Sequence, residues 1–411
     1  MIPFVSIRRL ASVTLGKMLQ TESSSPLDVQ ANYLRAAHVQ PQGQLISFED
    51  DQVMWFSPTE LRNSSLKAGD VVIVEGGAGF GRSAVLEQDM RGWGFQNSII
   101  RLRPKAGRAH GRFLDYCLQS ALAEGTTSLV CSTATIPHFT AEKVAGFRVP
   151  APTISAQVAI ADHLDRETAK IDALIEKQRS LITGLKERRQ AEVDRVIRQA
   201  TGIPGTPLRQ LAIIQTGITL GKTDSGSETR EYPYLRVANV QIGRVDVDDM
   251  ATIQLPPSIA RGVMLRRGDV LMTEGGDRAA LGRGSMWDGS VEPCLHQNHV
   301  FALRPRLDRL LPEYLVYLLE SEGARRYFES TRRQTTNLSS TNSWLVRAFR
   351  LTLPTLKEQT RMVRSLDDAN ARIAMAVAKL ERSIAVSQER RSALITAAVS
   401  GQSDASIAKV A

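Results

Sequence analysis

Two stretches of the chain carry apolar residues at helical spacing over an unusual length. The first stretch holds Ile160, Leu164, Ile171, Leu174, Leu181 and Leu185, and the second holds Ile373, Val377, Leu380 and Ile384. Apolar side chains that recur every three or four residues form one stripe along a helix. The pattern therefore predicts two long amphipathic helices.

Local signals mark the ends of these helices. The second opens at Thr355-Leu356-Lys357-Glu358, a capping-box pattern directly after Pro354. The first begins just after Pro152 and ends near the breaker Gly202-Ile203-Pro204-Gly205. Both stripes have heptad-like spacing, so we expect the two helices to pack against each other. The alternative is that each helix packs separately on its own domain.

The segments that precede the helices have a mixed pattern. Short β-type runs punctuated by glycine occur at Val71–Val74, Ser98–Leu102, Val270–Met272 and Val300–Leu303. One helix is expected in each segment, at Gly111–Glu124 and at Pro312–Tyr327. The predicted fold class is therefore α+β.

The second half of the chain repeats the first at an offset close to 200 residues. Tyr33-Leu34-Arg35 matches Tyr234-Leu235-Arg236 at an offset of 201, and Arg188-Arg189 matches Arg390-Arg391 at 202. The order of matched blocks never changes, which is typical of a duplicated domain with loops of different length. We expect two globular domains, 1–152 and 203–354, each followed by a long helix, 153–202 and 355–411.

Composition narrows the class of protein. Of 411 residues 42% are hydrophobic and 23% charged, as in a soluble globular protein. No apolar run is long enough to cross a membrane, and Met1 to Leu10 reads unlike a signal peptide, so a cytoplasmic location is expected. The net charge of +9 makes a polyanion a plausible partner. Cys117, Cys131 and Cys294 are expected to be reduced, buried thiols.

Catalytic signatures are missing from the sequence. No lysine has Asp or Glu two residues before it, as a common metal-dependent nuclease requires. The only Pro-Pro pair, Pro256-Pro257, follows Leu255 and not the Asn or Asp of an amino-methyltransferase. His296 and His299 lack a third ligand nearby in the sequence. We therefore expect no catalytic residue and no metal site.

The ordered, duplicated motifs resemble the specificity subunit of type I restriction-modification systems over essentially the whole chain. They are Tyr234-Leu235-Arg236 with Asn239-Val240, Gly268-Asp269-Val270-Leu271, Gly282-Arg283, Gln297-Asn298, Thr336-Asn337-Leu338-Ser339, Pro354-Thr355-Leu356-Lys357-Glu358-Gln359 and Arg390-Arg391. The first half departs from this pattern at Thr135-Ile136-Pro137, which stands in place of Asn337-Leu338-Ser339, and at Ser155-Ala156, which replaces Lys357-Glu358.

The resemblance implies a function and a set of partners. Each globular domain is a target-recognition domain that reads one half of a bipartite, asymmetric sequence in double-stranded DNA. The two long helices form an antiparallel coiled coil on which two modification (methyltransferase) subunits and the restriction subunits dock. S-adenosylmethionine, Mg and ATP are then expected only in those partner subunits. A helix of about 30 residues spans roughly 45 Å, which makes half-sites about one turn of DNA apart reachable.

Duplication also sorts the candidate DNA contacts. Basic positions shared by both halves are candidates for phosphate contacts: Arg35 and Arg236, Lys67 and Arg266, Arg82 and Arg283, Arg103 and Arg304. Positions that differ are candidates for reading bases: His38 against Asn239, and Arg278, Arg332, Arg333 and Asn337 in the second half. A solvated surface role is the alternative for each of these. For Gln96-Asn97 and Gln297-Asn298 a structural turn is favoured over base contact.

Two rival functions remain open at this point. The chain is a helical scaffold that binds proteins without reading DNA, or it is an enzyme whose motif is not recognisable. A chain that methylates or cuts DNA alone favours the enzyme, and a lack of DNA binding in the presence of modification subunits favours the scaffold.

Overall fold

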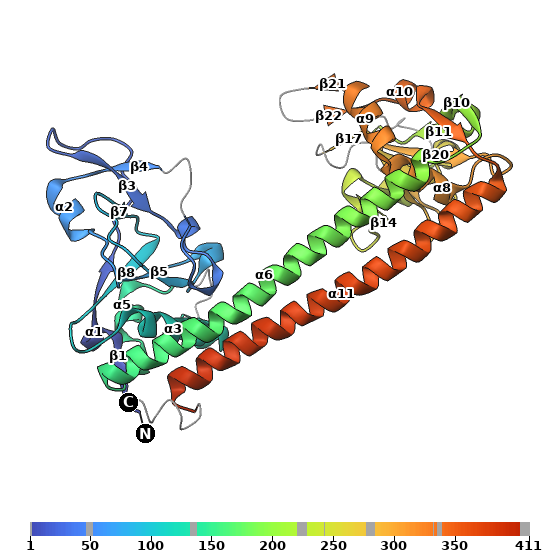
Figure 1. The fold of residues 1–411 in the computed structure, drawn as a ribbon. Helices are drawn as coiled ribbons and strands as arrows, with labels where there is room; N and C mark the ends of the chain where they lie inside the picture. The colour runs from blue at the N-terminus through green and yellow to red at the C-terminus, as the bar shows by residue number, and fades with distance from the viewer. Residues whose placement is uncertain are drawn as a thin grey trace. The chain divides into compact units, whose positions relative to one another are not determined.

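The computed structural model describes residues 2–46, 52–131, 138–219, 228–241, 243–276, 284–331, 333–334 and 339–402. The chain divides into two compact units. Unit 1 lies within residues 1–179 and 381–411, and unit 2 is residues 180–380. Each unit contains one mixed α/β module together with parts of both long helices (Figure 1).

Module 1 extends from β1 to β9 and lies entirely in unit 1. Its strands are β1 (Phe4–Ser6), β2 (Ala11–Leu15), β3 (Val29–Leu34), β4 (Val53–Phe56), β5 (Val71–Val74), β6 (Ser83–Val85), β7 (Gly94–Phe95), β8 (Ile99–Pro104) and β9 (Arg148–Pro150). Its helices are α1 (Ile7–Leu10), α2 (Pro58–Asn63), α3 (Gly111–Ala123), α4 (Thr126–Val130) and α5 (Ala141–Gly146), with short 3-10 turns η1 (Ala36–His38), η2 (Pro41–Gly43) and η3 (Gly77–Gly79).

Module 2 extends from β10 to β23 and lies in unit 2. Its strands are β10 (Ile203–Pro207), β11 (Ala212–Thr216), β12 (Arg230–Leu235), β13 (Val240–Gln241), β14 (Arg244–Val245), β15 (Ala251–Leu255), β16 (Val270–Thr273), β17 (Gly275–Gly276), β18 (Gly284–Met286), β19 (Leu295–His296), β20 (Val300–Pro305), β21 (Arg333–Gln334), β22 (Ser339–Ser340) and β23 (Arg350–Leu353). Its helices are α7 (Pro257–Gly262), α8 (Pro312–Glu320), α9 (Glu322–Thr331) and α10 (Ser343–Ala348), with η4 (Leu208–Gln210) and η5 (Val237–Asn239).

The two modules have the same sheet topology. Each has a four-stranded antiparallel sheet, in the order β2-β8-β5-β6 in module 1 and β11-β20-β16-β18 in module 2. Each also has a three-stranded sheet, β4-β3-β7 and β15-β12-β19, in which the last pair is parallel. The register is the same, since Ala11 pairs with Pro104 as Ala212 pairs with Pro305. The internal repeat predicted from sequence is confirmed.

Two helices of 45 residues each, α6 (Ile154–Arg198) and α11 (Leu356–Ser400), follow the modules. The predicted capping box is present at the start of α11, where the amide of Glu358 donates to Thr355 Oγ1 and the amide of Thr355 donates to Glu358 Oε2. Both helices contribute residues to both units.

The helices run antiparallel where they pair. In unit 1, Gln178 of α6 donates to Ser383 of α11 at 2.7 Å, and Arg391 donates to Asp172 at 3.0 Å. A higher number on one helix meets a lower number on the other, which requires opposite directions. The predicted antiparallel coiled coil is confirmed.

The ends of the helices are part of the module cores. In unit 1, the core around β5, β8 and α3 includes Ile160, Ala161 and Leu164 from α6 and Ile395, Ala398 and Val399 from α11. In unit 2, the core around β16, β20 and α8 includes Val193 and Val196 from α6 and Met362, Val363 and Leu366 from α11. The two long helices therefore pack against each other, and their ends pack on both modules. The alternative of two separate helices, each on its own domain, is not realised.

Two details differ from the sequence prediction. The helix expected over Pro312–Tyr327 is split into α8 and α9, because Ser321 is extended and its hydroxyl donates to the carbonyl of Leu318. Leu174 and Leu181, assigned to the buried stripe, are 48% and 51% exposed. Ile175 and Gln178 are the buried residues in this part of α6, whereas Ile160 and Leu164 are buried as predicted.

Other expectations about burial are met. Cys117, Cys131 and Cys294 are buried and form no disulfide, and burial raises the pKa of Cys294 to about 12. Among the residues that the structure describes, no helix is long and apolar enough to span a bilayer.

Candidate nucleic-acid interface

The shared arginines Arg35 and Arg236 occupy equivalent places in the two modules. Each precedes a 3-10 turn, η1 or η5, and is half-buried. The Arg236 guanidinium donates to Asp249 Oδ2 at 3.1 Å, but Asp249 is 96% exposed, so water competes strongly for this ion pair. Arg236 is therefore free to exchange its carboxylate partner for a phosphate at low cost.

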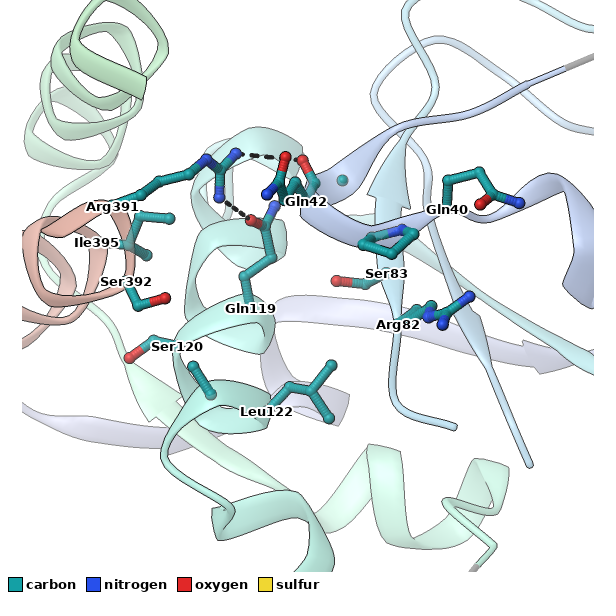
Figure 2. A pocket seen from close by; sticks show the side chains of 13 residues that line it. Gln40, Gln42, Arg82, Ser83, Gln119, Ser120, Leu122, Arg391, Ser392 and Ile395 are labelled. Atoms are coloured by element: carbon teal, nitrogen blue, oxygen red, sulfur yellow. Dashed lines mark hydrogen bonds between the residues drawn. The ribbon is translucent and has the colours of Figure 1, made fainter. Parts of the chain in front are cut away.

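Arg82 lies in unit 1 at the wall of a cavity of about 200 Å³ (Figure 2). The other walls come from the 40–43 turn, from Gln119 on α3 and from Arg391 on α11. Arg391 donates to the carbonyl of Gln42 and to Gln119 Oε1, both at 3.2 Å. Arg82 is half-buried, and within the described residues it has no ion-pair partner.

The remaining candidate contacts cannot be placed. Arg278, Arg283, Arg332 and Asn337 lie outside the described residues. Arg333 begins the short strand β21, and its side chain also lies outside what the structure describes.

Other duplicated arginines have a structural role that the sequence did not reveal. Arg103 forms a two-pronged ion pair with Asp70 at 2.8 and 2.7 Å. Arg304 forms the same pair with Asp269 at 2.8 and 2.7 Å. Both aspartates are buried, and each also accepts the backbone amide three residues earlier, that of Lys67 or Arg266. The expectation of phosphate contacts for Arg103 and Arg304 is replaced by this internal role.

The variable pair His38 and Asn239 is also structural. The amide of Arg35 donates to His38 Nδ1 at 3.0 Å, and the amide of Arg236 donates to Asn239 Oδ1 at 2.8 Å. Both side chains are buried inside their turns. Two chemically different residues thus supply the same acceptor, and neither is available to read a base.

The Gln-Asn pairs are turn residues, as the sequence favoured. The amides of Gln96 and Gln297 donate to the carbonyls of Leu34 and Leu235 at 2.9 Å in both cases. Directly against these turns lie Gly16 and Gly217, where a Cβ atom would come within 2.1 and 2.0 Å of a backbone oxygen. Only glycine allows this close approach.

A second set of matched contacts ties each long helix to its module. The side chain of Gln157 accepts the amide of His110, and that of Gln359 accepts the amide of Leu311. Both glutamine side chains also donate to two nearby carbonyls. The two glutamines are separated by 202 residues, as the last matched blocks of the repeat are. The sequence gave them no role, because most of their partners lie about 50 residues away.

The histidines of module 2 have separate environments. His296 is fully buried, its Nδ1 lies 2.6 Å from the carbonyl of Val300, and burial lowers its pKa. His299 is exposed, and its Nδ1 lies 2.6 Å from Glu274 Oε2. Within the described residues, no three His, Cys, Asp or Glu side chains are arranged to hold a metal ion. The pair of His299 and Glu274 was missed by sequence reasoning, although His299 differs from its counterpart Ser98.

The fold thus defines a class of protein with two copies of one α/β module that share a pair of antiparallel helices. Residues 57–183 match the family described as type I restriction modification DNA specificity domain. The resemblance of this chain to type I restriction-modification specificity subunits is confirmed.

Individual proteins show the same resemblance. The chain is 25% identical over 160 residues to the MjaX type I restriction enzyme specificity subunit of Methanocaldococcus jannaschii, covering 38% of this chain and 37% of that protein. It is 23% identical over 270 residues to the type I restriction enzyme EcoKI specificity subunit of Escherichia coli, covering 62% of this chain and 57% of that protein. The matched parts therefore span less than two thirds of either relative.

A solved structure shares the fold across the whole chain. A chain from a type I restriction-modification system, solved to explain complex assembly and conformational transition, superposes with a TM-score of 0.64 at 18% identity. The match covers 97% of this chain and 98% of that one.

Proposed function

We propose that this chain is the DNA-sequence-recognition subunit of a type I restriction-modification complex and reads a bipartite, asymmetric target. The observation that carries the proposal is the duplicated module. Its sheet topology and internal contacts are the same in both copies, while residues on its surface differ. Two modules with the same fold but different surface residues are suited to recognise two different half-sites. Segments 1–152 and 203–354 are the two target-recognition domains in this proposal.

The DNA contacts divide into two kinds. Arg35, Arg82, Arg236 and Arg283 bind phosphates, because they are shared basic positions and phosphate contacts carry no sequence information. The base-reading residues are taken from positions that differ between the modules: Arg278, Arg332, Arg333 and Asn337. Arginine and asparagine suit this role because they form two-pronged hydrogen bonds to guanine and adenine edges.

The long helices are the docking site for two modification subunits and for restriction subunits. Exposed apolar side chains on the helices support this part of the proposal, since such residues mark protein interfaces when they cluster. In unit 1 these are Leu174 on α6 and Val386 on α11, and in unit 2 they are Leu181 on α6 and Met375 on α11. Leu174 and Leu181 are seven residues apart and therefore lie on one face of α6.

Catalysis is assigned to the partner subunits. The chain itself contributes no catalytic residue, and S-adenosylmethionine, Mg and ATP act in the modification and restriction subunits. The complex is proposed to work in the cytoplasm, where its substrate DNA lies.

Methylome sequencing of a methylation-free host tests the function. The host carries the modification subunit with this chain, without it, or with this chain lacking residues 203–354. We expect a bipartite adenine-methylated motif only with the full chain. An assembled complex that leaves the DNA unmethylated would favour the scaffold alternative, and methylation by the purified chain alone would favour the enzyme alternative.

A further inference from the structure

Ser98 and His299 occupy the same place in the two modules. In module 1, the amide of Glu75 donates to the carbonyl of Ser98 at 2.9 Å. In module 2, the amide of Glu274 donates to the carbonyl of His299 at 2.8 Å. Both glutamates stand at the end of a central strand, β5 or β16, so the backbone of this corner is the same in both copies.

This corner also anchors a third segment of each module. The carbonyl of Glu75 accepts the amide of Phe139, and that of Glu274 accepts the amide of Thr341, both at 2.8 Å. In module 2, β17 follows Glu274 directly and pairs with β22, which pairs with β21. Three chain segments thus converge at Glu274. Among the described strands, only module 2 has the small sheet formed by β17, β22 and β21 at this corner.

The side chains at this corner differ between the modules, although the backbone is the same. His299 is 55% exposed, while its Nδ1 is held 2.6 Å from Glu274 Oε2. An ionised carboxylate only accepts hydrogen bonds, so Nδ1 carries the proton that it donates to Glu274. In module 1 the smaller, half-buried Ser98 stands in this place, and its hydroxyl accepts the amide of Ala36 at 3.3 Å.

A fixed imidazole on an exposed corner has one remaining functional atom. Within the described residues, Nε2 of His299 has no hydrogen-bond partner. The carboxylate of Glu274 fixes the orientation of the ring, as second partners of functional histidines commonly do. An orientated ring nitrogen at the edge of a module can make a single directional hydrogen bond to a base edge in the major groove.

We propose that His299, orientated by Glu274, is a base-reading residue of module 2 and contributes to specificity at one base pair of one half-site. The proposal rests on the proposed function, because it presupposes that module 2 contacts DNA. It adds a residue whose surroundings explain why a histidine stands at a place where module 1 has a serine. The simpler alternative is that this exposed contact between His299 and Glu274 serves the fold alone and adds little to its stability.

A selection from randomised DNA tests the proposal. The assembled complex of this chain with its modification subunit is incubated with a library in which both half-sites are randomised, and the bound DNA is sequenced. For His299→Ala we expect the preference at one base pair of one half-site to fall about tenfold, with every other position unchanged. Glu274→Gln keeps the imidazole but removes the carboxylate that accepts the Nδ1 proton and orientates the ring. We expect it to weaken the preference at the same base pair to a smaller extent.

Matched variants separate the possible outcomes. Ser98→Ala, at the same place in module 1, is expected to leave both half-sites unchanged. Unaltered preferences in His299→Ala, or a uniform loss of binding to every sequence, would overturn the proposal. A wild-type complex that selects no sequence at all would instead refute the proposed function, so the two failures are distinguishable.

Discussion

Modules 1 and 2 share contacts at their centres and differ at their edges. The buried ion pairs of Arg103 with Asp70 and of Arg304 with Asp269 have the same two distances in both modules. At the exposed corner after β5 and β16, by contrast, Ser98 in one module is replaced by His299 in the other. The two modules can therefore be used as controls for each other. A residue that is the same in both modules is explained first by a role in the shared fold.

Some positions that differ between the modules are buried. His38 and Asn239 differ in type, yet both cap the same turn by accepting an arginine amide. Difference alone therefore does not indicate base reading. Exposure is needed as a second criterion, which His299 satisfies and His38 does not.

Removal of the buried aspartate should produce the largest effect and the same effect in both modules. Asp70→Ala and Asp269→Ala each leave a partly buried arginine without its partner and a turn amide without its acceptor. We expect each to destabilise its own module by about 3–5 kcal/mol. Hydrogen exchange followed peptide by peptide assigns the loss to one module.

The exposed Asp308→Ala serves as control and should change stability by less than about 0.5 kcal/mol. If Asp70→Ala and Asp269→Ala lowered the free energy of unfolding by very different amounts, the two ion pairs would not be energetically equivalent, and the modules would not be equivalent at their centres.

The glutamine contacts should rank next. Gln157→Leu and Gln359→Leu each remove a buried side chain that accepts one backbone amide and donates to two carbonyls. We expect a loss of about 2–4 kcal/mol in each case, because unsatisfied buried polar groups are costly. Urea denaturation measures the loss, and an unchanged midpoint for either variant would contradict the proposed tie between helix and module.

The sequence predicted the fold well because its strongest signals are repetitive. The long helices and the capping box at Thr355 arise from local spacing, and the two modules arise from blocks that repeat in the same order; the structure confirms all three. The role of Arg103 was not predictable, because its partner Asp70 lies 33 residues away. An ion pair between distant strands of a sheet produces no periodic pattern in the sequence. An arginine shared by both halves therefore could not be distinguished from a phosphate contact.

A pH dependence should distinguish unit 1 from unit 2. Burial raises the pKa of Asp115 from 3.8 to about 6, although Ser83 and Gln119 donate to its carboxylate. The stabilising contribution of this group is full below about pH 3.8 and is lost as the pH rises through about 6. The equivalent residue in module 2 is Val316, which does not titrate.

Asp115→Asn removes this titration. Relative to the wild type, unit 1 of the variant should gain on the order of 2–3 kcal/mol between pH 4 and pH 7, while unit 2 should not change. Unfolding followed at both pH values by hydrogen exchange provides the measurement. A constant difference between variant and wild type across this range would mean that Asp115 titrates normally.

The smallest effects on stability are expected at the shared arginines. Arg35→Ala and Arg236→Ala should weaken DNA binding equally for all sequences and reduce the slope of log K against log salt by about 0.9 each. Filter binding of the assembled complex at several salt concentrations measures the slope. Arg306→Ala, at an exposed position of module 2, is the control, and a changed sequence preference in Arg236→Ala would assign it to base reading.

The candidate site was less predictable than the fold. Arg278, Arg332 and Asn337 were selected because they stand at positions that differ between the two halves and can bond to base edges. They lie outside the described residues, so they stay predictions. The pair of His299 and Glu274 was overlooked because 25 residues separate its members and because the histidines were considered only as metal ligands, a role that the sequence did not favour.

Because the end of α11 belongs to the core of module 1, the two modules can complete their cores at different stages of synthesis. Module 2 finds its helix segments in chain that is adjacent in sequence, whereas the core of module 1 includes Ile395, Ala398 and Val399 from the far end of the chain. Ser120 meets Thr396 across 276 residues. At about 5–20 residues per second, the ribosome completes module 1 and α6 roughly 10–40 s before that last helix emerges. During this interval the first module lacks the apolar side chains that α11 contributes to its core, so it can complete that core only after the second module has been synthesised.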